Sequence, residues 1–280
     1  PIVVIALVLT VALAPENLPN LDKQWDVVSS FYALVALSGL TMAIKQAAQN
    51  PATALAALAA AAVGAWLFVR RQHRLADPLL TFDIFRSRLF TGGVLAAAGG
   101  MFVLAGAELM TTQKLQLVDA LTPLAAGATV AVMALSAIPA SVLGGAYLHK
   151  IGFLPLIAGG FFGAVVGAVA LATGWTSIGM VLLGLSAGSV MSVSSIAIIG
   201  SAPMHRSGMA AGVEEVSYEL GTLITVALTG SLLQAALDRG ADYTAAYNQV
   251  IGVLAAGAAC FAVATWWCFR DNPKSGGVDA

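Results

Sequence analysis

Long apolar stretches, separated by short charged or Pro/Gly-rich segments, run through nearly the whole chain. Within them Ala, Leu, Val and Gly follow one another for about twenty residues, without the alternating polarity of a membrane β-strand. About twenty helical residues cross the hydrocarbon core of a bilayer. Cutting the chain at its polar segments leaves nine apolar segments, of which all but the first are long enough to be membrane helices: 1–14, 27–46, 52–69, 91–110, 123–147, 154–173, 176–200, 208–235 and 247–269.

The composition agrees with a chain that lies mostly in lipid. Its 280 residues are 59% apolar and 10% charged, whereas soluble proteins average about 45–50% apolar and about 25% charged. We therefore expect an all-α integral membrane protein. The net charge of -1 gives no indication of nucleic-acid binding. Cys260 and Cys268 have no histidine or acidic neighbours, so they indicate neither a disulfide framework nor a metal site.

The two ends of the chain differ from the rest. Residues 1–14 are apolar but too short to cross a membrane. They also lack an initial methionine and basic residues, so they do not resemble a signal peptide. We expect 1–14 to be the end of a helix that starts in a preceding part of a longer chain, and 271–280 to be a cytoplasmic tail.

The basic residues predict the orientation in the membrane. Three of the 13 Lys and Arg residues, Lys45, Lys114 and Arg239, fall on one side of the predicted spans. The remaining ten fall on the other side: Lys23, Arg70, Arg71, Arg74, Arg86, Arg88, Lys150, Arg206, Arg270 and Lys274. Loops rich in Lys and Arg stay in the cytoplasm. The pattern predicts that this richer side, and with it the C-terminus, is cytoplasmic.

The basic segment 70–90 separates two predicted spans. Leu79, Phe82, Phe85 and Leu89 are spaced as an apolar helical stripe among charged residues. We expect an amphipathic segment along the inner leaflet. The alternative is a plain basic loop that holds the topology.

Four acidic residues lie inside predicted spans. Glu108 is in the span 91–110, and Glu214, Glu215 and Glu219 are in the span 208–235. An ionisable group at the centre of a membrane helix costs roughly 2.5–3.5 kcal/mol, so three of them within two turns need a polar cavity or a partner.

The spacing of these acids predicts how they lie. Glu215 and Glu219 are four residues apart and share one helix face, whereas Glu214 lies about 100° away, on the side of Tyr218. The spans offer no Lys or Arg at the same depth. We therefore expect protons, water, a cationic ligand or a preceding part of the protein to neutralise the carboxylates. The alternative is a structural role in which the carboxylates are hydrogen-bonded, and for Glu108 contact with interfacial water.

Two small-residue motifs have both structural and functional interpretations. Gly208 and Gly212 form a G-x-x-x-G pattern, and we interpret it as close helix packing. Residues 184–188 match the G-x-S-x-G motif of serine hydrolases. That motif requires a strand-to-helix turn, whereas Ser186 lies in mid-span and the three histidines lie in loops. We therefore interpret it as packing and expect no enzyme.

Four short stretches resemble motifs of known transporters. Residues 145–152, Gly-Ala-Tyr-Leu-His-Lys-Ile-Gly, resemble the G-x-x-x-D-[RK]-x-G loop of the major facilitator superfamily. Residues 70–80, 111–117 and above all 211–221, Ala-Gly-Val-Glu-Glu-Val-Ser-Tyr-Glu-Leu-Gly, resemble the 14-span drug:proton antiporters of that superfamily. The resemblance covers essentially the whole chain as the last nine spans.

The resemblance implies a division of the chain. Residues 1–14 would end the last helix of an N-terminal bundle, and 27–69 would form two linker helices. Residues 70–90 would be a basic cytoplasmic segment, and 91–270 a C-terminal bundle of six helices built as an inverted repeat. The tail would be 271–280. Without the other half, this chain would lack one wall of the transport cavity.

The resemblance also implies roles for the acids. In exporters of quaternary ammonium compounds and cationic dyes, acidic residues of the penultimate span serve proton coupling and cation recognition. This implies such roles for Glu214, Glu215 and Glu219, with Glu108 as a secondary acid. Tyr218 would offer its ring face to a cation.

Two departures from the family pattern stand out. Gly145, Lys150 and Gly152 match the conformational loop motif, but His149 stands where the motif has Asp. Some cation exporters carry an acidic residue in the fifth of our predicted spans, whereas residues 131–145 contain none.

The sequence thus predicts a proton-driven exporter of lipophilic cations in a bacterial cytoplasmic membrane, monomeric, with the proton gradient in place of a cofactor. Two alternatives remain open. One keeps the fold but exports another solute, such as an amino acid, a siderophore or a lipid precursor. The other is a membrane scaffold or binding module, or a lipid-handling enzyme, whose carboxylates are structural.

Overall fold

The computed structural model describes Val4, Leu7 and residues 26–47, 50–75 and 78–270, without the side chain of His205. Apart from Val4 and Leu7, the segment 1–14 lies outside the described residues, as does the tail 271–280. In the described part, eight helices are long and apolar enough to cross a membrane. They are α2 (Val27–Gln46), α3 (Pro51–Gln72), α4 (Arg88–Leu117), α5 (Pro123–Ile151), α6 (Phe153–Ala172), α7 (Thr176–Gly200), α8 (Ser207–Asp238) and α9 (Tyr243–Phe269).

These helices confirm the expected all-α membrane fold, and their ends follow local capping chemistry. Five of them begin after a Ser, Thr, Asp or Asn whose side chain accepts a hydrogen bond from a backbone N–H of the first turn. The capping residues are Asp26, Asn50, Ser87, Thr122 and Asp242. Because proline has no N–H to lose at a first helical position, Pro51 and Pro123 reinforce two of these starts.

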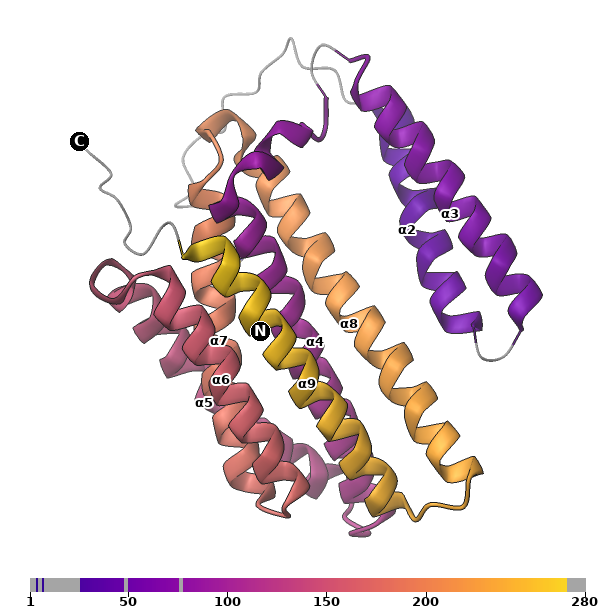
Figure 1. Ribbon diagram of the computed structural model, residues 1–280, viewed down its shortest axis with the longest axis vertical. Helices are drawn as coiled ribbons and strands as arrows, with labels where there is room; N and C mark the ends of the chain where they lie inside the picture. The colour runs from indigo at the N-terminus through magenta and orange to yellow at the C-terminus, as the bar shows by residue number, and fades with distance from the viewer. Residues whose placement is uncertain (1–3, 5–6, 8–25, 48–49, 76–77, 271–280) are drawn as a thin grey trace.

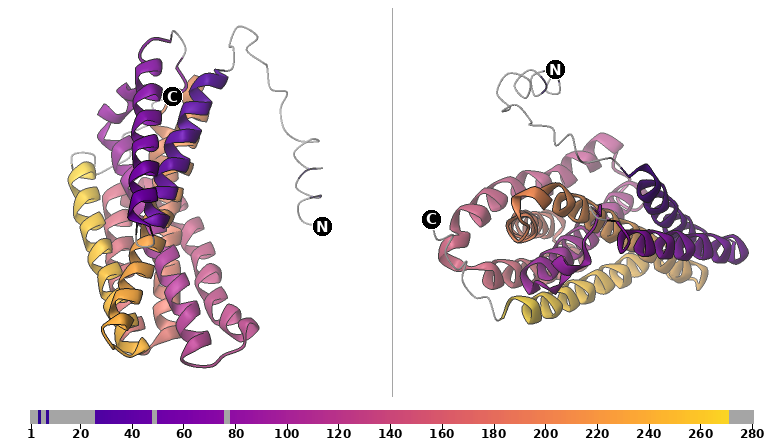
Figure 2. Two further views of the ribbon diagram at one scale, coloured as in Figure 1. Left: turned by 90° about the vertical axis from the view of Figure 1, so that its right-hand side faces the viewer. Right: turned by 90° about the horizontal axis from the view of Figure 1, so that it is seen from above.

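The helices form a group of six, α4 to α9, with the α2–α3 hairpin beside it (Figures 1 and 2). Helices α4 and α7 are central. In each, 56% of the residues in the most apolar 18-residue stretch are buried, against 11% in α2 and in α3. Helices α5 and α6 pack on α7, and α8 and α9 pack on α4. The hairpin meets the group through α2, which contacts α8.

Small residues allow the closest approaches between helices. A side chain on Gly184 or Gly188 of α7 would strike the backbone of Met133 or Ala137 in α5. Ser186, between them, donates a 2.7 Å hydrogen bond to the Leu182 carbonyl within α7. The G-x-S-x-G stretch therefore lies in mid-helix and packs helices together, as expected.

The packing role expected for Gly208 and Gly212 is wrong for the described residues. An added Cβ at either glycine would meet no atom within 4 Å, and the same holds for Gly230. The close approach of α8 to α4 occurs instead at Gly221, where a Cβ would strike the backbone of Ala98. Pattern alone did not distinguish the packed glycine from the open ones, because the direction of each face depends on the neighbouring helices.

The segment between α3 and α4, expected to be an amphipathic segment or a plain basic loop, contains only short local structure in its described residues. Helix α3 continues to Gln72, and in the described residues from 78 onward only a 3-10 turn, η1 (Phe82–Arg86), precedes α4. We call residues 78–86 the strap. It lies at the end of the molecule where α2, α4, α6 and α8 begin. We call this the basic end, because it is the side on which ten of the 13 Lys and Arg residues are predicted to fall.

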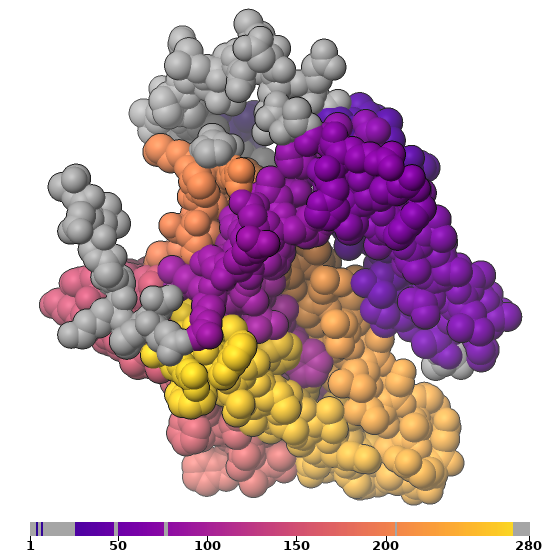
Figure 3. Space-filling view, turned by 45° about the horizontal axis from the view of Figure 1, so that its top comes forward, coloured from indigo at the N-terminus to yellow at the C-terminus, as the bar shows by residue number. Residues whose placement is uncertain are grey.

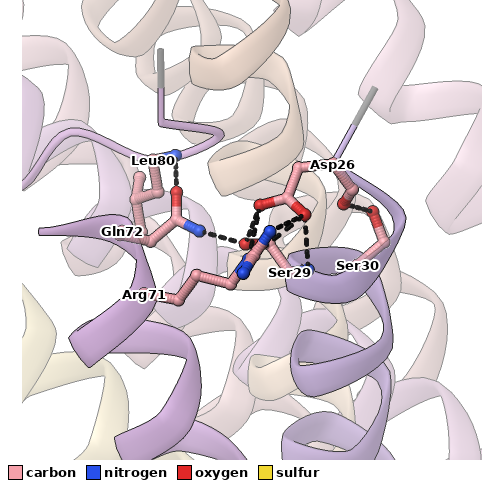
Figure 4. Close-up of polar contacts among 6 residues, drawn as sticks. All are labelled: Asp26, Ser29, Ser30, Arg71, Gln72 and Leu80. Carbon is pink, nitrogen blue, oxygen red and sulfur yellow. Dashed lines mark hydrogen bonds and ion pairs between the residues drawn. The ribbon is translucent and has the colours of Figure 1, made fainter. Parts of the chain in front are cut away.

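A polar network joins the hairpin to the strap (Figure 4). Arg71 donates from Nε and Nη2 to the carboxylate of Asp26 at 2.9 Å. Gln72 donates to the Ser29 hydroxyl at 2.8 Å and accepts from the Leu80 N–H at 3.0 Å. One side chain therefore connects α2, α3 and the strap.

The strap in turn holds the start of α8. Arg206 donates to the Thr81 hydroxyl at 3.2 Å and to the Asp83 carboxylate at 3.1 Å. The hydrogen bond from Thr81, together with Arg206, holds the pKa of Asp83 below its usual range. The Thr81 N–H also points to the sulfur of Met209 at 3.3 Å. Hydrogen bonds thus run from the start of α2 to the start of α8.

We expect Gly221→Ala to lower the stability of the protein by about 1–3 kcal/mol, because the added methyl group overpacks the contact with Ala98. Thermal unfolding in detergent measures this change. Gly230→Ala is the matched control in the same helix, and we expect it to change stability by less than about 1 kcal/mol. Equal melting temperatures for the two variants would contradict the packing.

The Asp26–Arg71 contact predicts a pH dependence. Arg71 and Ser29 lower the pKa of Asp26 in the folded protein, so the unfolded chain binds this proton first as the pH falls. We expect Asp26→Asn to melt below the wild type between about pH 5 and 8, and the difference to close as the pH falls through the lowered pKa. Asn still caps a helix, so the variant tests the charge. A difference that does not vary with pH would exclude the ion pair as its cause.

Candidate functional site

Helix α8 presents two contrasting faces. Its buried face follows α4 and is largely polar or small: Ala210, Glu214, Ser217, Gly221, Thr225, Thr229, Leu233 and Ala236. Glu215 and Glu219 are exposed on another face. The sequence analysis expected this separation of Glu214 from the other two acids, and the structure confirms it.

Glu214 has a local partner. The hydroxyl of Tyr218, one turn further along α8, donates a 2.7 Å hydrogen bond to the Glu214 carboxylate. Tyr218 also packs against a small apolar cluster that includes Phe90 and Ile198. A buried carboxylate with a donor in place is held in one orientation, so Glu214 and Tyr218 form a unit directed into the helix bundle.

Glu215 and Glu219 line a pocket of about 420 Å³ between α8 and α2. Most of its wall is apolar, from Leu37 and Met42 of α2 and from neighbours of the acids on α8. Two hydroxyl residues of α2 also line it, Ser38 and Thr41. A mostly apolar pocket with a few convergent polar groups is typical of small-molecule sites.

The pocket also has a basic residue in its wall. Lys45 lies near the end of α2 and lines the same pocket as Glu215 and Glu219. The expectation that the spans offer these acids no basic residue did not include a lysine that shares their cavity. Among the described ion pairs within 4 Å, none joins Lys45 to either glutamate. No pattern in the sequence predicts this placement, since it depends on how far α2 is offset along α8.

Glu108 does not join the other acids. It is exposed on α4, two residues beyond Gly106, which lies beside Thr225 of α8. Thr225 is six residues beyond Glu219, so Glu108 lies about 9 Å or more further from the basic end. The structure therefore separates Glu108 from the pocket between α2 and α8.

Sequence reasoning also missed the hydroxyl groups on the buried face of α8. Ser217 and Thr229 donate to backbone carbonyls one turn earlier in the helix. Thr225 Oγ1 is buried without a hydrogen-bond partner among the described residues. The sequence signal was a polar residue recurring every three or four positions in an otherwise apolar span.

The loop motif at 145–152 forms a tight corner between α5 and α6. Gly152 adopts φ 90°, a conformation that favours glycine, and its N–H bonds the Leu148 carbonyl at 2.7 Å. Gly145 lies close to α7, with Ser192 Oγ 3.3 Å from where its Cβ would be. His149 and Lys150 are exposed in the last turn of α5, where positive charge complements the helix dipole.

Among the described residues no group of three or more His, Cys, Asp or Glu side chains is arranged to hold a metal ion. No protein-family model matches the chain. The multidrug efflux pump LfrA of Mycolicibacterium smegmatis, however, is 32% identical over an aligned length of 292 positions, which covers 98% of this chain and 58% of LfrA. The chain is a homologue of bacterial multidrug efflux pumps.

Other relatives point the same way. The methyl viologen resistance protein SmvA of Salmonella typhimurium is 27% identical over 83% of this chain and 49% of its own length. The drug efflux pump JefA of Mycobacterium tuberculosis is 28% identical over 88% of this chain and 50% of its own length. The chain thus spans about half the length of these relatives. The resemblance to the drug:proton antiporters of the major facilitator superfamily is confirmed, and this efflux-pump homologue is a multi-pass membrane protein.

We expect Tyr218→Phe to destabilise the protein by about 1–3 kcal/mol, because the buried Glu214 carboxylate loses its donor. Unfolding in detergent measures this loss. Adding Glu214→Leu to this variant also removes the carboxylate that has lost its donor. We therefore expect the double variant to recover part of the lost stability. Tyr147→Phe, at an exposed tyrosine, is the control, and a Tyr218→Phe variant as stable as this control would contradict the contact.

Proposed function

We propose that the full-length protein exports lipophilic cations in exchange for protons, with Glu215 and Glu219 at the site where the two compete. The observation that carries this proposal is the pocket between α2 and α8, in which two carboxylates share an apolar wall. Protons and cationic drugs both neutralise a carboxylate, so binding of one weakens binding of the other.

The physical chemistry of the pocket favours a large apolar cation. Its leucine, valine and methionine side chains contact hydrocarbon or aromatic surface, while the carboxylates interact with positive charge. A hydrophilic solute would lose its hydration shell against such a wall without replacement hydrogen bonds. The name of one relative supports the positive charge of the substrate, since methyl viologen is an organic cation that is permanently charged.

Glu214 and Tyr218 have a different place in this proposal. Their hydrogen bond lies on the face of α8 that packs against α4, away from the pocket. A change in the protonation of Glu214 would alter the contact between the two helices rather than the contact with substrate. We assign Glu215 and Glu219 to the competition between proton and cation, and Glu214 to a second contribution to proton coupling through helix packing.

The test is efflux of ethidium from energised vesicles that contain the full-length protein. We expect Glu215→Gln combined with Glu219→Gln to reduce efflux about tenfold or more, because each charge-assisted contact contributes about 1.5–3 kcal/mol. A proton uncoupler should abolish efflux by the wild-type protein. Glu108→Gln, outside the pocket, is the matched control and should retain most activity.

An efflux rate that changes neither with the uncoupler nor with the double substitution would overturn the proposal. Export of neutral or anionic solutes, with the glutamates acting only through pH, would favour a transporter of another solute. Melting temperatures of the variants separate loss of function from loss of folding.

A further inference from the structure

The charges around the pocket between α2 and α8 do not cancel. Glu215 and Glu219 contribute two carboxylates, and Lys45 contributes one ammonium group. When all three are ionised, the pocket has a net charge of about −1. Because the ammonium group forms no described ion pair with either acid, it acts across the cavity through its electric field.

The fold holds α2, and with it Lys45, in place through contacts at the middle and at the basic end of the helix. Helix α2 packs closely against α3, since a Cβ on Gly39 would lie 2.8 Å from the Ala61 nitrogen. At the basic end, Asp26 and Arg71 tie the two helices together. The strap then connects this hairpin to the first turn of α8, as described above. The space-filling view shows the hairpin beside α8 at the surface (Figure 3).

The remaining wall of the pocket is uncharged. Leu37, Met42, Leu220 and Leu223 are apolar, and the hydroxyl groups of α2 carry no charge. The charge balance between ligand and pocket is therefore decided by the two acids and Lys45. A ligand with one positive charge neutralises the pocket, whereas a ligand with two leaves it with a net positive charge.

We propose that Lys45 determines the charge of the cation that the pocket accepts, by favouring monovalent over divalent organic cations. This inference rests on the proposed function, in which the pocket binds lipophilic cations. Lys45 is a specificity-determining residue here, because it acts on the ligand through space and does not take part in proton exchange.

The experiment compares two ligands that share one scaffold. N-methyl-4,4'-bipyridinium carries one positive charge, and methyl viologen carries two. Their transport constants are measured in vesicles that contain the full-length protein, with the membrane potential clamped at zero so that it does not act on ligand charge. The readout is the ratio of kcat/KM for the dication to kcat/KM for the monocation.

We expect Lys45→Gln to raise this ratio roughly three- to tenfold, from the loss of one charge about 8–10 Å from the ligand at an effective dielectric constant between those of protein and water. Lys45→Glu should raise it further in the same direction. Lys45→Arg keeps the charge and should leave the ratio unchanged. Arg239→Gln, which removes a positive charge at the far end of α8, is the matched control and should also leave it unchanged.

An unchanged ratio in both Lys45→Gln and Lys45→Glu overturns the inference, and so does an equal change in Arg239→Gln. If Glu215→Gln with Glu219→Gln abolishes efflux while the Lys45 variants keep the wild-type ratio, the proposed function stands and the role of Lys45 falls. If the glutamate variant transports both ligands normally, the proposed function falls, and the inference falls with it.

Discussion

Satisfaction of backbone hydrogen bonds in a medium without water is the constraint on which the rest of this structure depends. It makes every described span a helix, and it leaves side chains as the polar groups available for chemistry. Ionisable side chains at this depth are costly, so their placement decides what the molecule can do. Here three of the acids, Glu214, Glu215 and Glu219, lie on one helix, α8, and divide between two of its faces.

The two faces of α8 serve different physical purposes. On the buried face, Gly221 brings the helix against α4, and the bond from Tyr218 holds the carboxylate of Glu214. On the other face, Glu215 and Glu219 meet a cavity rather than a side-chain partner. Because one helix carries both a buried polar face and exposed carboxylates, a change in the charge of the carboxylates can be linked to a change in helix packing.

The α2–α3 hairpin contributes directly to the acidic pocket. It supplies one wall of the acidic pocket and its positive charge, Lys45. At the basic end, Gln72 and Arg206 both bind the strap, so the hairpin and the first turn of α8 are joined through hydrogen bonds. A movement of α8 would therefore act on the hairpin as well. The pocket is formed by two elements that are separated by well over a hundred residues.

The sequence by itself determined the all-α membrane fold, the helix positions and the two faces of Glu214 and Glu215, because these follow from hydropathy and helical periodicity along one segment. Only the tertiary structure decided which glycines are packed, that Glu108 lies apart, and that Lys45 shares a pocket with two glutamates. It also decided that part of the basic segment at 70–90 is a strap bound by Arg206. Each of these depends on the offset and rotation of one helix against another, and sequence spacing within a single helix carries no information about either.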